Sequence, residues 1–472
     1  MTTVPRTIGD LARRGDRPAL VGGVGAPLDH RALALTVAAL ADGLTRRGVG
    51  PGSVVAVALP SGPTQVAATL AVLAAGATAA PLLLDWWPRE LEAAADLVGA
   101  DLLLGDHTLP TTLHRDAALL DPAAPAPFAA FGCGPVPSTT PDHLTAHRPL
   151  LPATAELWVA STGGNGEPGV FAYTAAQLER FWFRPDPAVG DRRAAVWTPT
   201  AHGPTLRFVL GTIAGGGTVH CTDRWAPRRA TTALAVDGAD VLWAGVGQLG
   251  RVLAAGAPAD VTLSTVIATG GALGSRDRDR IGERFAATVQ RRYTAAEAGG
   301  WVSVEDVPAD GVVGSTVPGH DHGPQIAVDG PGAAVRARGR GPRTPHGWAT
   351  GDRASTTGGV GTVRPVGRLA DAFLVDGTAV HPADVEAVLA EDPRLAQVAI
   401  VPRPDPVRGS IPVAVTVPAD PEDPPFLVDL AERLAGVPLH ARPAAQAIVD
   451  ELPLTVSGQV HRRLLVYEEA SR

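Results

Sequence analysis

The residues that most clearly suggest chemistry are "STGGNGEPG" at positions 161–169. Glycines let a backbone turn so that several N–H groups converge on an anion, and the hydroxyls of Ser161 and Thr162 could add hydrogen bonds. The stretch follows the apolar run "ELWVA", as a loop follows a buried strand. It does not match the Walker pattern, which ends in lysine and a hydroxyl residue. The residues alone fit either a phosphate-binding loop or a flexible surface turn.

The basic residues of this chain are unusual, because all 40 of them are arginine and lysine is absent. Arginine can replace lysine on a surface, but not where a compact point charge is needed. The net charge of −8 argues against nucleic-acid binding and favours a small molecule or a protein as partner. Cys133 and Cys221 have no metal or redox spacing, and no secretion signal is visible. We therefore expect a cytoplasmic protein.

The elements that must position such a loop alternate between helix and strand. Helical periodicity covers 29–48, 61–76 and 87–100, and the second of these helices is expected to start with Ser61 as its cap. Short apolar runs at 51–60, 77–85 and 101–106 predict strands. The uncharged stretch 66–84 is better explained by a buried helix and a buried strand than by a membrane span, because Gly76 and Pro81 interrupt it.

The alternation resumes after a proline-rich segment at 105–150, which we expect to be a surface connection. Further strands are predicted in "RRAAVWTPT", "GGTVHCT", "ADVLWAG" and "LSTVIATGG", with a helix near Leu206 to Ala214. A new α+β segment starts near Gly367 with the helix "HPADVEAVLAEDP". The predicted class is α/β, with parallel sheets covered by helices.

Several segments, taken in order, resemble the adenylate-forming (AMP-binding) superfamily, which includes acyl- and aryl-CoA synthetases and the adenylation domains of peptide synthetases. No one segment is decisive, but their joint order is specific and covers nearly the whole chain. The segments are "LTRRGVGPGSVVAVALPSGP", "AVLAAGATAAPLLLDWWPREL", "TPTAHGPTLRFVLGTIAGGGTVHCTDRW", "TGGALGSRDRDRIGERF", "RRYTAAEAGG", "HGWATGDRA", "VGRLADAFLVDGTAVHPADVEAVL" and "ELPLTVSGQVHRRLL".

The resemblance implies an architecture and a reaction. The architecture is a large N-terminal AMP-binding region of several α/β subdomains (1–366), a hinge (367–371) and a small mobile α+β C-terminal domain (372–472). In the reaction, a carboxylic acid and ATP with Mg²⁺ give an acyl adenylate. A thiol, either CoA or the phosphopantetheine of a carrier protein, then takes the acyl group.

The resemblance also implies site residues. The phosphate loop would comprise Ser161, Thr162, Gly163, Gly164, Asn165 and Gly166. Adenine would lie against Gly270, Gly271 and Ala272 and stack on Tyr293. On the residues alone, these positions also fit an ordinary strand-to-helix turn and a core tyrosine.

Four further positions complete the implied site. Glu297 would help to hold Mg²⁺ as an oxygen ligand. Asp352 and Arg368 would contact the ribose, although a turn aspartate and a surface arginine are alternatives. His202 would gate the acid pocket or cap a helix as a structural residue. The readable pocket positions are small and apolar, which favours an acyl or aryl acid over an amino acid.

Two lysines of the family pattern are missing. Gln459 occupies one position, and Pro168 is followed directly by Gly169 at the other. Ala296 also stands where the family has threonine. Drift away from lysine should have left arginine, so these losses indicate a change of function. Loss of one preorganised donor typically costs about 10²–10³ in rate.

Three functional hypotheses remain open. The first is a ligase of secondary metabolism that activates an acyl or aryl acid with impaired adenylation. The second is an enzyme of a different half-reaction that uses a preformed acyl adenylate or thioester. The third is a non-catalytic nucleotide- or acyl-binding partner of another protein.

Overall fold

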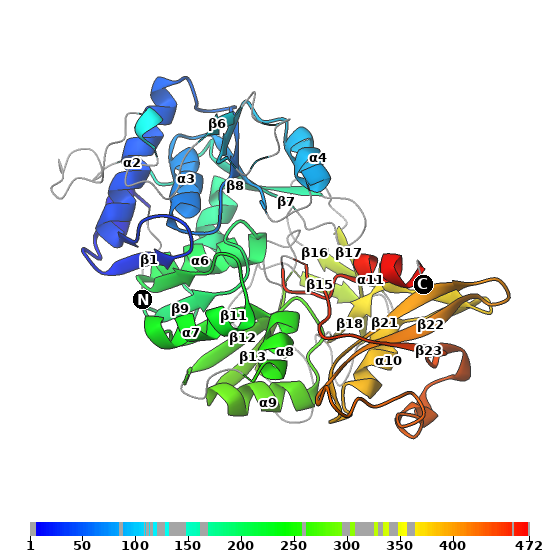
Figure 1. Ribbon diagram of the computed structural model, residues 1–472. Helices are drawn as coiled ribbons and strands as arrows, with labels where there is room; N and C mark the ends of the chain where they lie inside the picture. Colours follow the sequence, from blue (N-terminus) through cyan, green and yellow to red (C-terminus); the bar gives the residue numbers. More distant parts are fainter. Residues whose placement is uncertain are drawn as a thin grey trace.

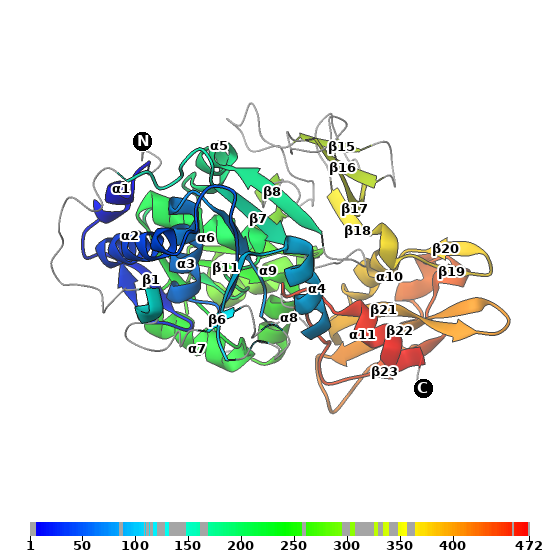
Figure 2. The ribbon, with the colours of Figure 1, turned by 90° about the horizontal axis from the view of Figure 1, so that it is seen from above.

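The protein has a large N-terminal region of helix-covered sheets and a smaller C-terminal domain beside it, as the computed structural model in Figure 1 shows. Seen from above, the C-terminal domain meets the N-terminal region along one side (Figure 2). The described residues are 6–84, 88–107, 109, 113, 117–119, 128–131, 148–160, 169–256, 261–294, 303–306, 325–328, 334–338, 348–355, 364–455 and 457–470.

A six-stranded sheet forms the upper part of the N-terminal region. Its strands lie in the order β6-β5-β3-β4-β7-β8, and all neighbours are parallel except β7 and β8. Helix α3 is buried along its whole length, which explains its uncharged sequence. The elements are α2 (His30–Arg46), β3 (Val54–Ala58), α3 (Pro63–Ala74), β4 (Thr78–Pro81), α4 (Pro88–Val98), β5 (Leu102–Gly105), β6 (Ala117–Leu119), β7 (Glu156–Ala160), β8 (Val170–Thr174) and α5 (Ala175–Gln177).

An eight-stranded sheet forms the lower part, in the order β14-β13-β12-β11-β9-β10-β1-β2. Its central strands are parallel, and helices α8 and α9 pack against β11, β12 and β13. The elements are α1 (Ile8–Ala12), β1 (Pro18–Gly22), β2 (Leu28–Asp29), β9 (Arg193–Val196), α6 (Gly203–Gly215), β10 (Thr218–Cys221), α7 (Pro227–Asp237), β11 (Val241–Gly245), α8 (Val246–Ala254), β12 (Thr265–Thr269), α9 (Ser275–Phe285), β13 (Thr288–Tyr293) and β14 (Ser303–Asp306).

The remaining elements make a four-stranded antiparallel sheet and the C-terminal domain. The four-stranded sheet comprises β15 (Gln325–Val328), β16 (Ala334–Arg338), β17 (Trp348–Ser355) and β18 (Arg364–Arg368). A single 3₁₀ turn, Leu369–Asp371, leads into the C-terminal domain. That domain comprises β19 (Phe373–Val375), β20 (Thr378–Val380), α10 (Pro382–Leu389), β21 (Leu395–Asp405), β22 (Gly409–Pro418), β23 (Ala445–Ile448) and α11 (Arg462–Ala470).

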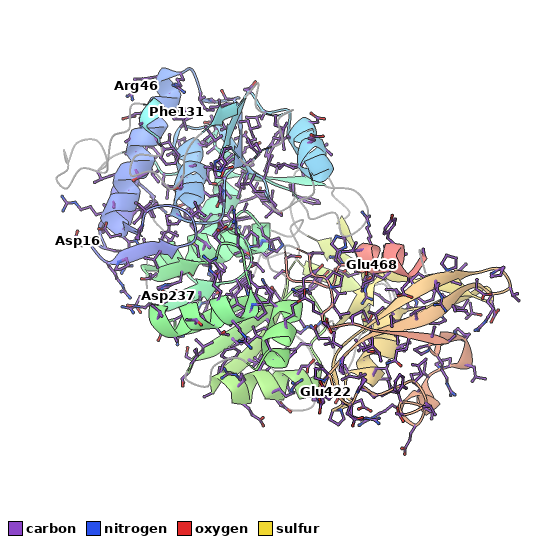
Figure 3. The ribbon with its side chains drawn as sticks, viewed as in Figure 1. Asp16, Arg46, Phe131, Asp237, Glu422 and Glu468 are labelled. Atoms are coloured by element: carbon purple, nitrogen blue, oxygen red, sulfur yellow. The ribbon has the colours of Figure 1, made fainter. Side chains whose placement is uncertain are left out.

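Side chains fill the space between the helices and the sheets, as Figure 3 shows. In the same view Asp16, Asp237, Glu422 and Glu468 lie on the periphery. Arg46, at the end of α2, donates a hydrogen bond of 3.1 Å to the Phe131 carbonyl beside it. Asp16, Glu422 and Glu468 are exposed, while aliphatic residues form the buried core.

The predicted α/β class, with helix-covered parallel sheets and a small C-terminal α+β segment, is confirmed. Within the described ranges, no helix is both long and apolar enough to cross a bilayer, and stretch 66–84 is α3 followed by β4. The expected cap at Ser61 is wrong. Gly62 caps α3, while the Ser61 hydroxyl accepts a hydrogen bond of 2.9 Å from the Thr200 backbone.

Candidate functional site

A cavity of about 1220 Å³ lies between the N-terminal region and the C-terminal domain. The N-terminal region contributes the turn after β12 and the end of β13, and the C-terminal domain contributes the loop before α11. Residues predicted from sequence that line it are Gly270, Gly271, Ala272, Tyr293, Asp352, Arg368 and Gln459. Positions spread over 190 residues of sequence are therefore brought to one cavity.

The turn after β12 begins with a glycine that lies close to Gln459. Gly270 has a φ of 76°, a conformation that side-chain-bearing residues rarely adopt. A Cβ built there would lie 3.2 Å from Cγ of Gln459. The turn therefore needs glycine for its backbone and for the close approach of position 459.

Four side chains in the cavity form a chain of polar contacts. The Tyr293 hydroxyl donates a hydrogen bond to the Asp352 carboxylate. The Arg368 Nε lies 3.8 Å from the other Asp352 oxygen. Arg368 also donates through Nη2 to Oε1 of Gln459, at 3.4 Å. Asp352 belongs to strand β17, so the alternative of a turn aspartate does not apply.

The Arg368 contact fixes the orientation of the Gln459 amide. A guanidinium can only donate, so the group that receives it must be the amide oxygen. The amide nitrogen is then near Gly270, since a Cβ built at Gly270 would lie 3.3 Å from it. Position 459 therefore contributes a neutral hydrogen-bond donor to the cavity.

The 3₁₀ turn Leu369–Asp371 is joined to the C-terminal domain by a partly buried ionic cluster. Arg462 donates to both oxygens of Glu386, at 2.6 Å each, and its Nε lies 3.0 Å from Asp371. Burial raises the pKa of Asp371 and Arg462 opposes this shift. The cluster ties the last residue of this turn to α10 and α11.

His202 does not line this cavity in the described part of the chain. It is the N-cap residue of α6, and its Nδ1 lies 3.1 Å from the Thr205 hydroxyl. Burial lowers its pKa from 6.5 to about 4, so the ring is neutral near pH 7. His202 thus lies at the start of a helix, as the structural alternative expects, although its side chain makes no capping bond, and its role at an acid pocket stays a prediction.

The His202 ring should make stability depend on acid. Between pH 6.5 and about 4 the His202 ring binds a proton in the unfolded chain but stays neutral in the folded chain. The free energy of unfolding therefore falls as pH falls through this range. Because His202 is partly exposed, we expect the free energy of unfolding to fall by about 1–2 kcal/mol, less than the full pKa shift would give. Urea unfolding at pH 7 and pH 4.5 measures it. His202→Gln should show a smaller difference between the two pH values, and equal differences would contradict this assignment.

Several predicted residues lie outside the described residues. These are the phosphate-loop positions Ser161, Thr162, Gly163, Gly164, Asn165 and Gly166, together with Glu297 and its neighbour Ala296. Cys133 lies outside them as well. Burial raises the pKa of Cys221 to about 12, so this thiol is unreactive. Among the described residues, no group of three or more potential ligands could hold a metal.

Sequence reasoning missed the contacts that hold the two parts together. Arg276 on α9 donates to four backbone carbonyls after α10, and Arg251 on α8 donates to the Leu452 carbonyl. It also missed the buried ion pair between Arg292 and Asp186, beside the cavity. No local pattern marks these arginines, because their partners are distant in sequence.

Comparisons with known proteins agree with this arrangement. The family described as "AMP-binding enzyme" matches residues 10–133, and the "AMP-binding enzyme C-terminal domain" matches 384–459. Feruloyl-CoA synthases from Amycolatopsis and Streptomyces are 31% identical over 300 residues, which is 57% of this chain and 60% of theirs. The acetyl-coenzyme A synthetase of Bacillus subtilis is 35% identical over 102 residues. The alignment thus spans about three fifths of the first two relatives.

Solved structures share the fold along nearly the whole chain. The anthranilate CoA ligase in complex with anthranoyl-AMP has a TM-score of 0.75 at 16% identity and covers 99% of this chain and 98% of its own. The o-succinylbenzoate CoA synthetase of Bacillus subtilis has a TM-score of 0.73 at 16% identity, covering 98% of both chains. At these identities the likeness shows the fold alone.

The fold and the cavity define a two-part protein with one candidate site between its parts. Its two parts are similar to the two domains of AMP-binding enzymes, at residues 10–133 and 384–459.

Proposed function

We propose that this protein is an acyl- or aryl-acid-activating ligase whose adenylation step is weakened. The observation that carries the proposal is the Gln459 amide, which lies in the cavity against Gly270 and accepts a hydrogen bond from Arg368. The relatives named feruloyl-CoA and acetyl-coenzyme A synthetases support the reaction class. We further propose the division into 1–366, a hinge at 367–371 and a C-terminal domain at 372–472.

The proposed first step joins the acid to AMP. A carboxylate oxygen attacks the α-phosphorus of ATP, a new P–O bond forms, and pyrophosphate leaves with the electrons of the old bond. Asp352 would accept hydrogen bonds from the ribose hydroxyls and Tyr293 would stack on the base. Gln459 would donate to the developing negative charge. A neutral amide stabilises that charge less than an ammonium does, so the step is slower than with lysine.

The residues present fit a nucleotide. Gly270, Gly271 and Ala272 line the same cavity as Asp352, so a base and a ribose could lie between them. Mg²⁺ would be held by Glu297 and would neutralise phosphate charge. Glu297 itself lies outside the described residues.

The proposed second step moves the acyl group to a thiol. The sulfur attacks the acyl carbonyl, a C–S bond forms, AMP leaves as the acyl–phosphate bond breaks, and the thiol proton passes to solvent. CoA or the phosphopantetheine of a carrier protein would supply the thiol, in a cytoplasmic pathway of secondary metabolism. This step does not require the lysine, so a protein specialised for it is the second candidate.

Two assays on the same preparation test the proposal. ATP–pyrophosphate exchange with a panel of acyl and aryl acids reports the first step, and thioester formation from synthetic acyl adenylates reports the second. We expect slow exchange and faster thioester formation. Exchange at ordinary rates for the family would contradict weakened adenylation. Silence in both assays, with no ATP binding by calorimetry, would instead support a non-catalytic partner.

A further inference from the structure

The loop that carries Gln459 rests on an unusual surface of the N-terminal region. Gly245 ends β11 and Gly247 lies in the first turn of α8. A Cβ at Gly247 would lie 2.6 Å from the Gly458 carbonyl oxygen, and one at Gly245 would lie 2.7 Å from the Gly458 Cα. The Gly247 N–H donates to that same carbonyl at 2.9 Å. Backbone therefore lies directly on backbone, which any side chain at these positions would prevent.

The loop itself is internally tied, so moving its backbone moves Gln459. The Thr455 N–H donates to the Gln459 carbonyl at 2.7 Å, and the Gln459 N–H donates to the Thr455 hydroxyl at 3.2 Å. Gly458 makes the turn with a φ of 75°. The position of Gln459 in the cavity is thus set by where Gly458 rests.

A second contact, on α9, holds the same domain. The Arg276 guanidinium donates to the carbonyls of Ala390, Asp392 and Leu395 through Nη1, at 2.8–3.2 Å, and to Pro393 through Nη2, at 3.1 Å. These carbonyls follow the C-terminal end of α10, where unpaired backbone oxygens attract a cation.

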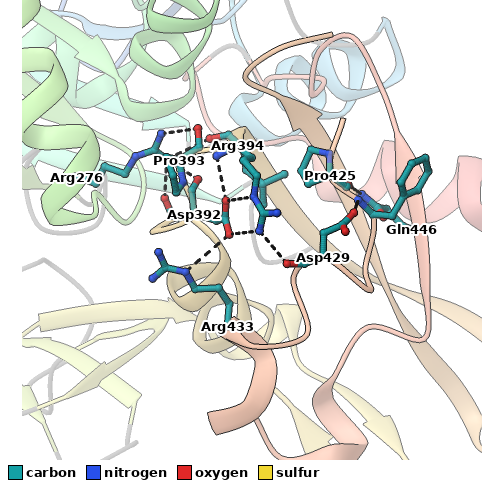
Figure 4. Close-up of polar contacts among 11 residues, drawn as sticks. Arg276, Asp392, Pro393, Arg394, Pro425, Asp429, Arg433 and Gln446 are labelled. Carbon is teal, nitrogen blue, oxygen red and sulfur yellow. Dashed lines mark hydrogen bonds and ion pairs between the residues drawn. The ribbon is translucent and has the colours of Figure 1, made fainter. Parts of the chain in front are cut away.

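The turn that Arg276 binds is already shaped from its other side. Arg394 pairs with the Asp392 carboxylate at 2.8 Å, and Arg433 approaches it at 3.8 Å (Figure 4). The carbonyls are therefore arranged before Arg276 meets them, so little order is lost when the contact forms.

From these contacts we infer that Gly247 and Arg276 are positioning residues that seat the C-terminal domain so that Gln459 enters the cavity. Gly247 acts because it has no side chain and lets the Gly458 backbone lie against it. Arg276 acts through its charge at the end of α10. They lie on different helices and contact different parts of the C-terminal domain. Because both contacts hold this one domain, we expect the loss of either to have the same effect. The effect on activity rests on the proposed function, whereas the position of the C-terminal domain does not.

The test uses the full chain with Gly247→Ala and Arg276→Ala. Alanine suits the interior of a helix better than glycine does, so Gly247→Ala should leave α8 intact while its methyl group displaces Gly458. Hydrogen–deuterium exchange of segments 245–250 and 453–461 should become roughly tenfold faster in both variants. Arg276→Lys, which retains a cation with fewer donors, should lie between wild type and Arg276→Ala.

Matched controls separate seating from general loosening. A Cβ at Gly436 has no atom within 4 Å, so Gly436→Ala should not change exchange in these segments. Arg280 pairs with Asp277 on α9 itself, so Arg280→Ala removes a charge from the same helix without touching the α10 carbonyls. Unchanged protection in both Gly247→Ala and Arg276→Ala would overturn the inference.

Activity supplies a readout that a merely structural role would not move. Both variants should lower pyrophosphate exchange about tenfold or more while leaving thioester formation from synthetic acyl adenylates at least as fast, because only the first step uses Gln459. An equal fall in both half-reactions would also overturn the inference. If the wild type were inactive in both assays, the proposed function would fail. Hydrogen–deuterium exchange would still decide whether Gly247 and Arg276 seat the domain.

Discussion

A Gln459→Lys substitution is expected to raise acid-dependent ATP–pyrophosphate exchange about tenfold to a hundredfold. An ammonium at this position would add a full positive charge where the amide now offers a neutral donor. The gain should be smaller than the roughly 10²–10³ of a complete donor, because the new cation would lie beside Arg368. Asp352 partly neutralises that arginine, so repulsion should not cancel the gain.

The comparison variant is Gln459→Met, which keeps the length of the side chain but removes the amide. Its exchange rate should fall below that of the wild type, and Arg368 should lose its contact with position 459. Thioester formation from a synthetic acyl adenylate should change little in either variant. Identical exchange rates for glutamine, lysine and methionine would show that position 459 does not limit the step.

An Asp352→Ala substitution is expected to weaken nucleotide binding about a hundredfold. Two groups now meet this carboxylate, the Tyr293 hydroxyl and the Arg368 guanidinium, and the proposed ribose contact would also be lost. Hydrogen bonds to a charged group each contribute about 1.5–3 kcal/mol, so removing the acceptor affects several at once. Calorimetric titration with AMP and ATP measures the affinity without requiring turnover.

Tyr293→Phe provides the matched comparison for Asp352. It removes the hydroxyl that donates to Asp352 but keeps the ring that would stack on the base. We expect a much smaller change in affinity than for Asp352→Ala, because the carboxylate that the ribose would contact stays in place. A loss in Tyr293→Phe as large as that in Asp352→Ala would place the effect in the polar chain and not in the ribose contact.

Much of the architecture could be predicted because its signals are local. The strands β3, β11 and β12 are short apolar runs bounded by turn residues, and each is almost wholly buried, as parallel sheets require. The start of α3 was mispredicted because a distant backbone N–H, that of Thr200, takes the Ser61 hydroxyl. A helix cap is a local pattern only when nothing else competes for the side chain.

Part of the cavity lining was predicted from sequence, but the contacts among its residues were not. The order of motifs pointed to Tyr293, Asp352, Arg368 and Gln459, and all four line one cavity. Nothing in the sequence indicated that their side chains bond to one another, since that depends on how β13, β17 and the last loop meet. Arg276 shows the same limit, because its four acceptors are backbone oxygens that carry no sequence signal.

The polar chain from Tyr293 to Gln459 has a consequence for ligand selectivity under the proposed assignment. These side chains bond to one another, so an incoming nucleotide would have to exchange bonds rather than simply add them. A nucleoside with both ribose hydroxyls can replace the partners that Asp352 gives up, whereas a 2′-deoxy nucleoside would leave one unreplaced. Discrimination between ATP and its deoxy analogue would then come from the hydrogen bonds that the cavity side chains make with one another.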